Sequence, residues 1–339
     1  MEHFLKGLPK VELHAHLNGS LGINSLRDLA EHLYGSASPE FLELCARFIR
    51  FEKDSDLDAC FAKFAFVHEL TSTAEGLRYA TELVVRDFAQ DNVQYVELRT
   101  TPKANESYSR RDYLQHVIKA IEGAKEKYTG ILVKLLPSIN RAEPVEVAEE
   151  TVSLAVEMSK SHPDVILGID FSGNPAKGKF LEFRCILSQA VQNGLKLVLH
   201  CAEIDNPSEV KEMLEFGMSR CGHGTFLNAK DIMYLKNNNI PIECCLTSNV
   251  KSGTVPSLKE HHLKRIMEAE APKVICTDDS GVFDTTLTKE FLLAAETFGL
   301  IRRQCIALTL EAVQHSFANK REKQLMAEKV NSYAAQHLC

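Results

Sequence analysis

Several features that would mark a membrane or secreted protein are missing from this sequence. No stretch of about 18 apolar residues occurs, so no membrane-spanning helix is expected. The first ten residues, MEHFLKGLPK, contain no apolar run of the kind found in a signal peptide. The ten cysteines include no CxxC pair. We therefore expect a cytosolic protein with no membrane partner, whose cysteines are reduced thiols and not a disulfide framework.

An excess of positive charge is also missing. The 339 residues include 46 acidic and 39 basic side chains, which gives a net charge of −7. Because nucleic-acid-binding proteins concentrate positive charge, we expect no nucleic-acid partner. Low-complexity tracts, long flexible linkers and repeats of fixed period are absent too. We therefore expect one domain over residues 1–339 and, since no interface pattern is visible, a monomer.

What the sequence does contain is an alternation of short apolar runs and amphipathic segments. Most of the runs are rich in Val, Ile and Leu at successive positions, which is typical of strands buried on both faces of a parallel sheet. The eight runs are 11–16, 93–100, 131–139, 165–173, 195–203, 219–225, 240–248 and 273–279. Helical patterns between them include 110–127, 149–160 and 179–192. This alternation indicates an α/β fold, and eight strands favour a closed (β/α)8 barrel of the TIM type.

Two segments are longer than a simple barrel requires. The first two strands are about 75 residues apart, far more than one crossover helix needs. Segment 22–90 contains several helical patterns, so we expect a helical cap inserted after the first strand. Segment 285–338 predicts two or three closing helices after the eighth strand.

Polar residues gather where the predicted strands end. Barrel enzymes build their active sites at the C-terminal ends of the strands. Histidines and carboxylates at the ends of five strands are hard to attribute to chance, so we expect an active site there. The strand-end residues are His14, His16, Arg99, Thr100, Asp170, Gly173, His200, Glu203, His223, Ser248, Asp278 and Asp279.

Four of these residues form a candidate metal site. His14 and His16 are two residues apart, so both imidazoles point to the same side of a strand. A chance HxH on a surface strand is the alternative, and the apolar flanks argue against it. His200 offers a third imidazole unless it is a satisfied core histidine, and Asp278 offers an oxygen. This mostly neutral ligand set suits Zn²⁺ better than Mg²⁺ or Ca²⁺, so we expect one zinc ion per chain.

Three further residues can supply acid–base chemistry. Glu203 can act as a general acid if burial raises its pKa, or it can be a glutamate stabilised at a helix N-terminus. His223 lies between two glycines and can point at a metal-bound water, or it can serve only in a turn. Asp279 can reach the substrate or the water, or it can belong with Asp278 to a solvated acidic turn.

With these residues assembled, the sequence resembles the adenosine deaminase family of metal hydrolases. The resemblance covers nearly the whole chain and follows the family's order through LPKVELHAHLNGS, LGIDFSG, HCAE, CGHGTFL, LTSNV and CTDD. An ordered set of six motifs is highly specific. It implies a hydrolase that removes the 6-amino or 6-alkylamino group from an adenine nucleoside or nucleotide.

The resemblance also implies roles for individual residues. The zinc ligands would be His14, His16, His200 and Asp278. Glu203 would donate a proton to the ring nitrogen next to C6, while His223 and Asp279 would orient and deprotonate the metal-bound water. The backbone of Gly173 would contact the purine ring, and His16 and Asp279 would contact the substrate too. The implied reaction is attack of zinc-activated hydroxide on C6, followed by loss of the amine.

Within the family, the closer resemblance is to the branch that acts on N6-substituted nucleotides such as N6-methyl-AMP. Asn18 stands in HAHLNGS where ordinary adenosine deaminases carry an Asp beside the ribose 5′-hydroxyl. An Asp would repel a 5′-phosphate by roughly 4 kcal/mol at about 4 Å and an effective dielectric of about 20. Asn18 removes this repulsion and can donate a hydrogen bond. The expected partner is therefore a small-molecule purine nucleotide.

The stretch ELRTTPK (97–103) resembles the same branch. The resemblance implies phosphate or ribose contacts by Thr100, Thr101, Pro102 and Lys103, and a substrate contact by His68 from the helical insertion. Two positions depart from the family pattern, because Lys103 stands where an Arg is expected and Asn140 where an Asp is expected. Lys and Arg do not bind phosphate with the same geometry. These departures affect ribose and phosphate contacts and leave the zinc centre untouched.

Three alternatives to a nucleotide deaminase remain at this point. An ordinary adenosine deaminase would act on the free nucleoside, and Asn18 argues against it. A protein that binds the metal and the purine without chemistry would not need Glu203, His223 and Asp279 together. A nucleic-acid deaminase is disfavoured by the net charge and by the absence of the H-x-E…P-C-x-x-C pattern.

Overall fold

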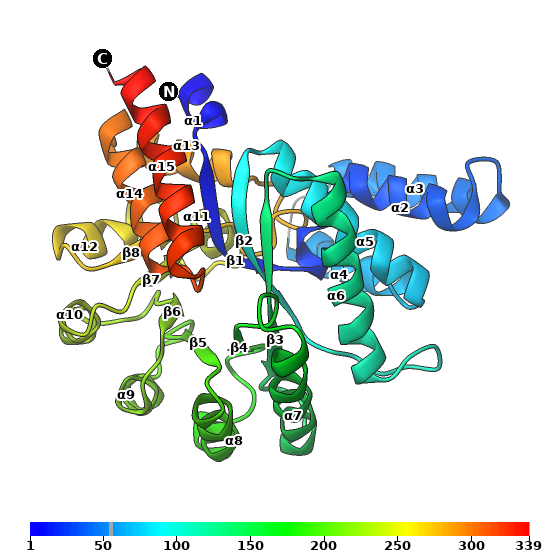
Figure 1. Ribbon diagram of the computed structural model, residues 1–339, viewed down its shortest axis with the longest axis horizontal. Coiled ribbons are helices and arrows are strands. Elements are labelled where there is room, and N and C mark those ends of the chain that lie inside the picture. Colours follow the sequence, from blue (N-terminus) through cyan, green and yellow to red (C-terminus); the bar gives the residue numbers. More distant parts are fainter. Residues whose placement is uncertain (54–56, 339) are drawn as a thin grey trace.

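The computed structural model describes residues 1–53 and 57–338 and contains one eight-stranded parallel sheet. The strands pair in chain order, β1 to β8, and curve into a barrel with the helices outside it (Figure 1). The predicted (β/α)8 fold class is confirmed. The strands are β1 (Lys10–His16), β2 (Val93–Thr100), β3 (Leu132–Asn140), β4 (Gly168–Ser172), β5 (Lys196–Cys201), β6 (Arg220–His223), β7 (Ile242–Cys244) and β8 (Lys273–Ile275).

The barrel closes through the segment that follows β8. A parallel bridge joins Ala15 of β1 to Asp278, whose backbone N–H donates to the His14 carbonyl oxygen at 2.8 Å. The His16 N–H in turn donates to the Asp278 carbonyl oxygen at 2.9 Å. Closure therefore brings Asp278 directly beside two of the predicted metal ligands, which lie more than 260 positions away in the sequence.

The helices follow the predicted alternation closely. The helix expected over 110–127 is α6, and those expected over 149–160 and 179–192 are α7 and α8. Strand-end expectations at two strands were wrong. β7 stops at Cys244 and Ser248 lies in α11, and β8 stops at Ile275, so Asp278 and Asp279 lie in the segment after it. The barrel helices are α6 (Arg110–Lys127), α7 (Val145–Ser161), α8 (Phe180–Gln192), α9 (Pro207–Phe216), α10 (Ala229–Asn237), α11 (Leu246–Lys251) and α12 (Leu263–Glu268), and a short 3-10 helix η2 (Leu258–Glu260) precedes α12.

Side chains at the helix ends explain where several helices begin. Ser109 accepts from the Asp112 N–H while the Asp112 carboxylate accepts from the Ser109 N–H, which forms a capping box at the start of α6. Asn319 and Glu322 form the same arrangement at α15. Three helices close the chain, as 285–338 predicted, and α1 precedes the barrel: α1 (Glu2–Gly7), α13 (Leu287–Phe298), α14 (Arg302–His315) and α15 (Lys320–His337).

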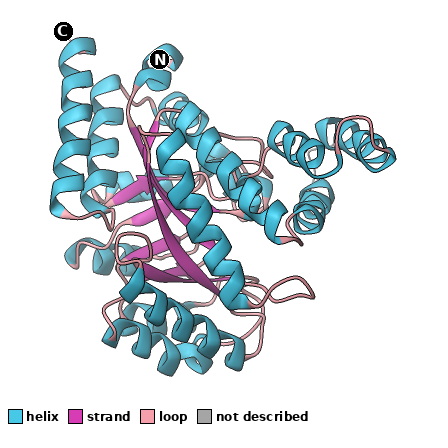
Figure 2. Cartoon of the chain, turned by 45° about the vertical axis from the view of Figure 1, so that its right-hand side comes forward, coloured by secondary structure: helices cyan, strands magenta, loops and turns pink. Residues whose placement is uncertain are grey.

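In the described part of the segment between β1 and β2 there are four helices and a 3-10 turn. Helices α2 and α3 project to one side of the barrel in Figures 1 and 2, whereas α5 packs against β2 and α6. Residues of α4 and η1 line the mouth of the barrel. Residues 54–56 of the predicted cap range 22–90 lie outside the described residues. None of the helices described is long and apolar enough to cross a membrane. The elements are η1 (Asn18–Ser20), α2 (Ile23–Tyr34), α3 (Pro39–Lys53), α4 (Leu57–Leu70) and α5 (Ala74–Gln90).

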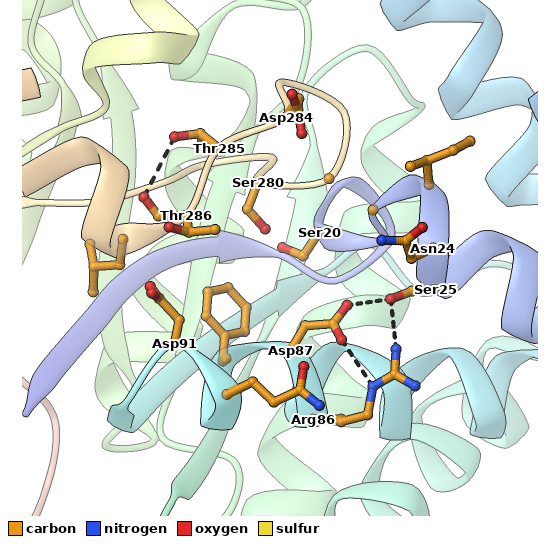
Figure 3. A pocket seen from close by; sticks show the side chains of 16 residues that line it. Ser20, Asn24, Ser25, Arg86, Asp87, Asp91, Ser280, Asp284, Thr285 and Thr286 are labelled. Carbon is orange, nitrogen blue, oxygen red and sulfur yellow. Dashed lines mark hydrogen bonds and ion pairs between the residues drawn. The ribbon is translucent and has the colours of Figure 1, made fainter. Parts of the chain in front are cut away.

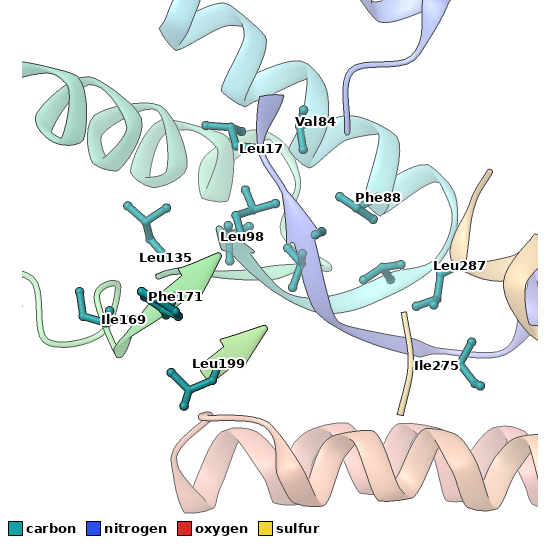
Figure 4. Packing of buried hydrophobic residues seen from close by; sticks show 14 of the residues in the cluster. Leu17, Val84, Phe88, Leu98, Leu135, Ile169, Phe171, Leu199, Ile275 and Leu287 are labelled. Atoms are coloured by element: carbon teal, nitrogen blue, oxygen red, sulfur yellow. The ribbon is translucent and has the colours of Figure 1, made fainter. Parts of the chain in front are cut away.

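The apolar core lies between the strands and the helices that surround them. Leu98, Leu135 and Leu199 contribute to it from three different strands, while Val84 and Phe88 pack from α5 (Figure 4). All five side chains are buried. Strands covered on the outside by helices and filled on the inside by other side chains bury both faces, which explains their continuous apolar runs.

The interior of the barrel is charged instead of apolar. Arg99 and Arg220 are fully buried, and Glu243 accepts from both, at 2.5 Å from Arg99 and 2.6 Å from Arg220. Arg220 also pairs with buried Glu97. Buried charges are tolerated only when partners satisfy them, so this network fixes the positions of several strands relative to one another.

Candidate active site

A cavity of about 370 Å³ opens at the C-terminal ends of the strands. Residues from η1, α4 and most of the strand ends meet there, although they are distant in the sequence. This is the end of the barrel at which the polar residues were expected. The lining residues are His16, Asn18, Gly19, Phe64, His68, Arg99, Thr100, Thr101, Lys103, Asn140, Glu143, Ser172, Gly173, His200, Glu203, His223, Asp278 and Asp279.

Three imidazoles and one carboxylate converge at the floor of this cavity. His14 Nε2 lies 3.1 Å from Asp278 Oδ1, and His16 Nε2 lies 3.3 Å from the same oxygen. His16 Nε2 and His200 Nε2 are 3.2 Å apart. Among the described residues, His14, His200, His223 and Asp278 form one group of possible ligands, and His16, Asp170 and His200 form another. The four residues proposed from sequence therefore lie together, and His223 stands beside them.

This cluster fits a metal ion of the zinc type. His14 Nε2 is buried and makes no hydrogen bond among the described residues, although its carboxylate neighbour is close. A buried polar atom without a partner is costly unless something else satisfies it. Nitrogen donors with a single carboxylate are typical of zinc sites.

Carboxylates behind the cluster lie beside the Nδ1 atoms of two of its imidazoles. Glu243 Oε2 lies 2.8 Å from His14 Nδ1, and Asp170 Oδ1 lies 3.1 Å from His200 Nδ1. Arg99 contacts both carboxylates, at 2.5 Å from Glu243 and 3.1 Å from Asp170. Burial alone would raise the pKa of both carboxyls, but the cationic neighbours hold each pKa well below its ordinary value. With Nδ1 beside these carboxylates, the Nε2 atoms of His14 and His200 face the other members of the cluster. Carboxylates in this position commonly orient metal-binding histidines.

Several site residues have unusual backbone conformations, which set the directions of their side chains or backbone groups. His223 and Asp278 have φ values of 60° and 65°, a left-handed region that non-glycine residues rarely adopt. Gly173 has a φ of 101°, and a Cβ there would lie 2.2 Å from the Asn140 side-chain oxygen. Only glycine fits at this position, and its backbone borders the cavity. Such conformations concentrate where the fold positions functional groups.

Two carboxyl groups in the cavity hold protons more tightly than usual. Burial, and then the negative charge of Asp278, raises the pKa of Glu203 to about 8. The same two causes raise the pKa of Asp279 to about 7. Glu203 Oε2 and Asp279 Oδ1 are buried and have no hydrogen-bond partner among the described residues. Both groups are therefore poised to exchange protons with whatever fills the cavity.

The mouth of the cavity joins η1, α4 and the segment after β2. The Asn18 amide nitrogen lies 3.1 Å from His68 Nδ1, and Lys103 Nζ lies 2.9 Å from His68 Nε2. The Tyr113 hydroxyl donates to the Asn18 side-chain oxygen at 3.4 Å and lies 2.6 Å from the Thr100 hydroxyl. This arrangement directs the amide group of Asn18, and not its oxygen, toward His68 and the opening.

The structure places nearly all of the sequence-predicted site residues in one cavity. His14 lies fully buried beneath the floor, and Pro102 is buried without lining the cavity. Sequence reasoning missed Glu243 and Tyr113. A lone glutamate inside the apolar run IPIECC was a usable signal for Glu243. Tyr113 carried no such signal, because a tyrosine on the apolar face of a helix is ordinary core.

Comparisons with known proteins give matches that extend over nearly the whole chain. A family model described as "Adenosine deaminase" matches residues 9–333. The adenosine deaminase-like protein of Drosophila melanogaster is 76% identical, over 98% of each chain. A structure of the N6-methyl-AMP deaminase from Arabidopsis thaliana aligns with a TM-score of 0.89 at 37% identity, covering 99% of this chain and 100% of that one. A structure of Arabidopsis ADAL complexed with IMP aligns with a TM-score of 0.87 at the same identity and coverage.

Proposed function

This chain belongs to the adenosine deaminase family of hydrolytic deaminases, and on that premise we propose that its substrate is an N6-substituted adenine nucleoside 5′-monophosphate. The reaction would convert N6-methyl-AMP and water to IMP and methylamine. A C6–O bond forms and the C6–N6 bond breaks. Of the two protons of the water, one ends on the departing methylamine and the other on ring nitrogen N1 of IMP.

The observation that carries this proposal is the polar mouth above the histidine–aspartate cluster. Asn18 and Lys103 both contact His68 on the rim of the same cavity. Lys103 supplies a cation and Asn18 a neutral amide donor, so an incoming phosphate meets attraction at both positions. Thr100 and Thr101 add hydroxyl groups to the same wall. The structure of Arabidopsis ADAL complexed with IMP, a nucleoside monophosphate, is consistent with this assignment.

We propose that the metal is one Zn²⁺ per chain, held by His14, His16, His200 and Asp278. As a Lewis acid, zinc makes water nucleophilic near neutral pH. The buried His14 nitrogen that lacks a partner supports this assignment. Glu243 and Asp170 would keep the ligand imidazoles oriented.

The chain's own groups would then handle the protons and the purine. Glu203, buried and without a partner for Oε2, would donate a proton to the ring nitrogen beside C6. His223 and Asp279 would orient the attacking water and accept its proton, while the backbone of Gly173 and the Asn140 side chain would border the purine and ribose. Protonating the ring makes C6 electrophilic, because it draws electron density out of the aromatic system.

A comparison of four substrates tests the proposal. We would measure kcat/KM of the zinc-loaded protein for N6-methyl-AMP, AMP, N6-methyladenosine and adenosine by the change in purine absorbance. We expect N6-methyl-AMP to be preferred. A preference for either nucleoside would contradict the phosphate assignment, and no turnover of any of the four would contradict the proposed reaction.

A further inference from the structure

His223 ends a chain of hydrogen bonds that begins at a backbone amide. We propose that this chain, Leu263–His261–Asn249, fixes the tautomer of His223 so that its Nε2 always presents an N–H to the active site. Asn249 and His261 are then positioning residues, which touch neither the cavity nor the proposed substrate. The inference rests on the proposed function only for its catalytic consequence.

The first link sets the tautomer of His261. The backbone N–H of Leu263 donates to His261 Nδ1 at 3.0 Å. A backbone N–H can only donate, so Nδ1 must be the unprotonated nitrogen of this ring. The ring is buried and stacks on the ring of His262, with 4.1 Å between the ring centroids. Burial, and to a smaller extent the charge of His262, lowers the pKa of His261 to about 2. His261 is therefore neutral, and its single proton is on Nε2.

The second link sets the orientation of the Asn249 amide. His261 Nε2 lies 3.1 Å from Asn249 Oδ1, so the ring N–H donates to the amide oxygen. The amide nitrogen must then point the other way, where it lies 3.4 Å from His223 Nδ1. Two hydroxyl oxygens, of Thr225 and Thr254, are also within 3.5 Å of this nitrogen and can accept from it.

The third link sets the tautomer of His223. An amide nitrogen can only donate, so His223 Nδ1 accepts, and the neutral ring carries its proton on Nε2. That N–H faces the cavity, 3.8 Å from Glu203 Oε1 and 4.0 Å from Asp278 Oδ2. His262 fixes the backbone as well, because its Nε2 lies 2.8 Å from the His223 carbonyl oxygen.

This tautomer gives different roles to His223 and Asp279, the two residues proposed to face the attacking water. With Nε2 protonated, His223 donates a hydrogen bond to the oxygen that attacks C6 and cannot remove its proton. Asp279, whose buried Oδ1 has no partner among the described residues, is the group that can accept that proton. The two roles that the sequence assigned jointly to His223 and Asp279 are thereby separated.

Nitrogen-15 spectra of the zinc-loaded protein with labelled histidines test the tautomer directly. We expect His223, identified by loss of its signals in His223→Asn, to show a protonated Nε2 and a bare Nδ1. A protonated Nδ1 in the native protein, or an Nε2 bound to the metal, would overturn the proposal. This result is independent of whether any substrate is turned over.

A second test replaces the hydrogen-bond donor of Asn249 with an acceptor. In Asn249→Asp a carboxylate replaces the donor, so it accepts from His223 Nδ1 and leaves Nε2 bare. We expect the tautomer to switch and kcat to fall at least about tenfold, while KM and one equivalent of zinc are retained. An unchanged tautomer in the folded variant would overturn the proposal.

Ser252→Ala is the matched control. Ser252 is exposed and donates at 3.4 Å to the backbone oxygen of Asn249, not to its side chain. We expect the native tautomer and native kcat in this variant. If the native protein shows the expected tautomer but does not turn over N6-methyl-AMP, the proposed function fails while the hydrogen-bond chain stands.

Discussion

Two cavities of similar size lie on either side of one wall. The active-site cavity measures about 370 Å³ and its neighbour about 410 Å³. Asn18 and Gly19 line the first, whereas Ser20 lines the second. The wall also includes the segment after β8, where the N–H of Gly281 donates to the Gly19 carbonyl oxygen at 2.9 Å. Volume alone does not distinguish the two.

Their polar groups do distinguish them. In the neighbouring cavity, Arg86 pairs with Asp87, and Ser25 donates to Asp87 (Figure 3). Arg86 also pairs with Asp28, which does not line the cavity. None of its lining side chains belongs to the buried atoms that lack a partner in the described part of the chain. The active-site cavity has several, which include atoms of Glu203 and Asp279. Polar groups left unsatisfied by the protein itself mark the cavity that is built for a ligand.

The largest expected effect is the loss of the metal from the active-site cavity. Asp278→Ala should abolish bound zinc and activity together, because it removes the oxygen that His14 and His16 both face. Metal content by atomic absorption and kcat/KM for N6-methyl-AMP would be measured. One equivalent of retained zinc would refute the ligand assignment.

Asp87→Ala is the matched carboxylate deletion on the other side of the wall. It should leave zinc content and kcat/KM near their native values and lower stability by about 1–3 kcal/mol, because Arg86 and Ser25 lose a partner. Loss of activity here would break the distinction between the two cavities.

Glu203→Gln should have the next largest effect. The amide keeps the shape of the side chain but cannot give up a proton as a carboxyl group does, so kcat should fall at least about a hundredfold while zinc stays bound. Steady-state kinetics and metal analysis on the same sample would decide. Near-native turnover would remove Glu203 from the mechanism.

Asn18→Asp should discriminate between substrates. A carboxylate at the mouth would repel a 5′-phosphate by roughly 4 kcal/mol at about 4 Å and a dielectric of about 20, so KM for N6-methyl-AMP should rise at least about tenfold. The KM for N6-methyladenosine should change much less. The neutral variant Asn18→Ser is the control, and equal effects of Asn18→Asp on both substrates would contradict the phosphate argument.

The smallest expected effect is a pH dependence of stability from His68. Burial, and then Lys103, lowers the pKa of His68 from 6.5 to about 4 in the folded protein. Between these two values the unfolded chain binds more protons than the folded one, so the free energy of unfolding falls as the pH drops from 6.5 to 4. His68→Gln should weaken this dependence in urea unfolding measured across that range. An unchanged slope would show that His68 titrates alike in both states.

The fold and much of the site were predictable because their signals are local. Most strands are short apolar runs, and a polar residue ends most of them or follows within a few positions, which can be seen without knowing the neighbouring strands. The HxH pair follows from the two-residue period of a strand alone. Glu203 and Asp279 could be singled out in the same way, since each lies within four residues of the end of an apolar strand.

The supporting residues were less accessible for a physical reason. Tyr113 lies on a buried helix face, and only the hydrogen bond from its hydroxyl to Asn18 shows that it orients a site residue. Asn249 and His261 touch His223 through a chain in which each donor is defined by the partner before it. Contacts of this kind depend on orientation, which no sequence spacing encodes.

The sequence by itself determined the parallel barrel, the end of the barrel that carries the site, and the types of residue gathered there. Periodicity and the direction of the chain are sufficient for these, because all parallel strands end at the same rim. Only the tertiary structure decided which cavity is lined by buried polar atoms that have no partner among the described residues. It also decided how Asp278 closes the barrel against β1 and which nitrogen of His223 carries the proton. These depend on distances of a few ångströms between residues far apart in the chain, and only folding sets such distances.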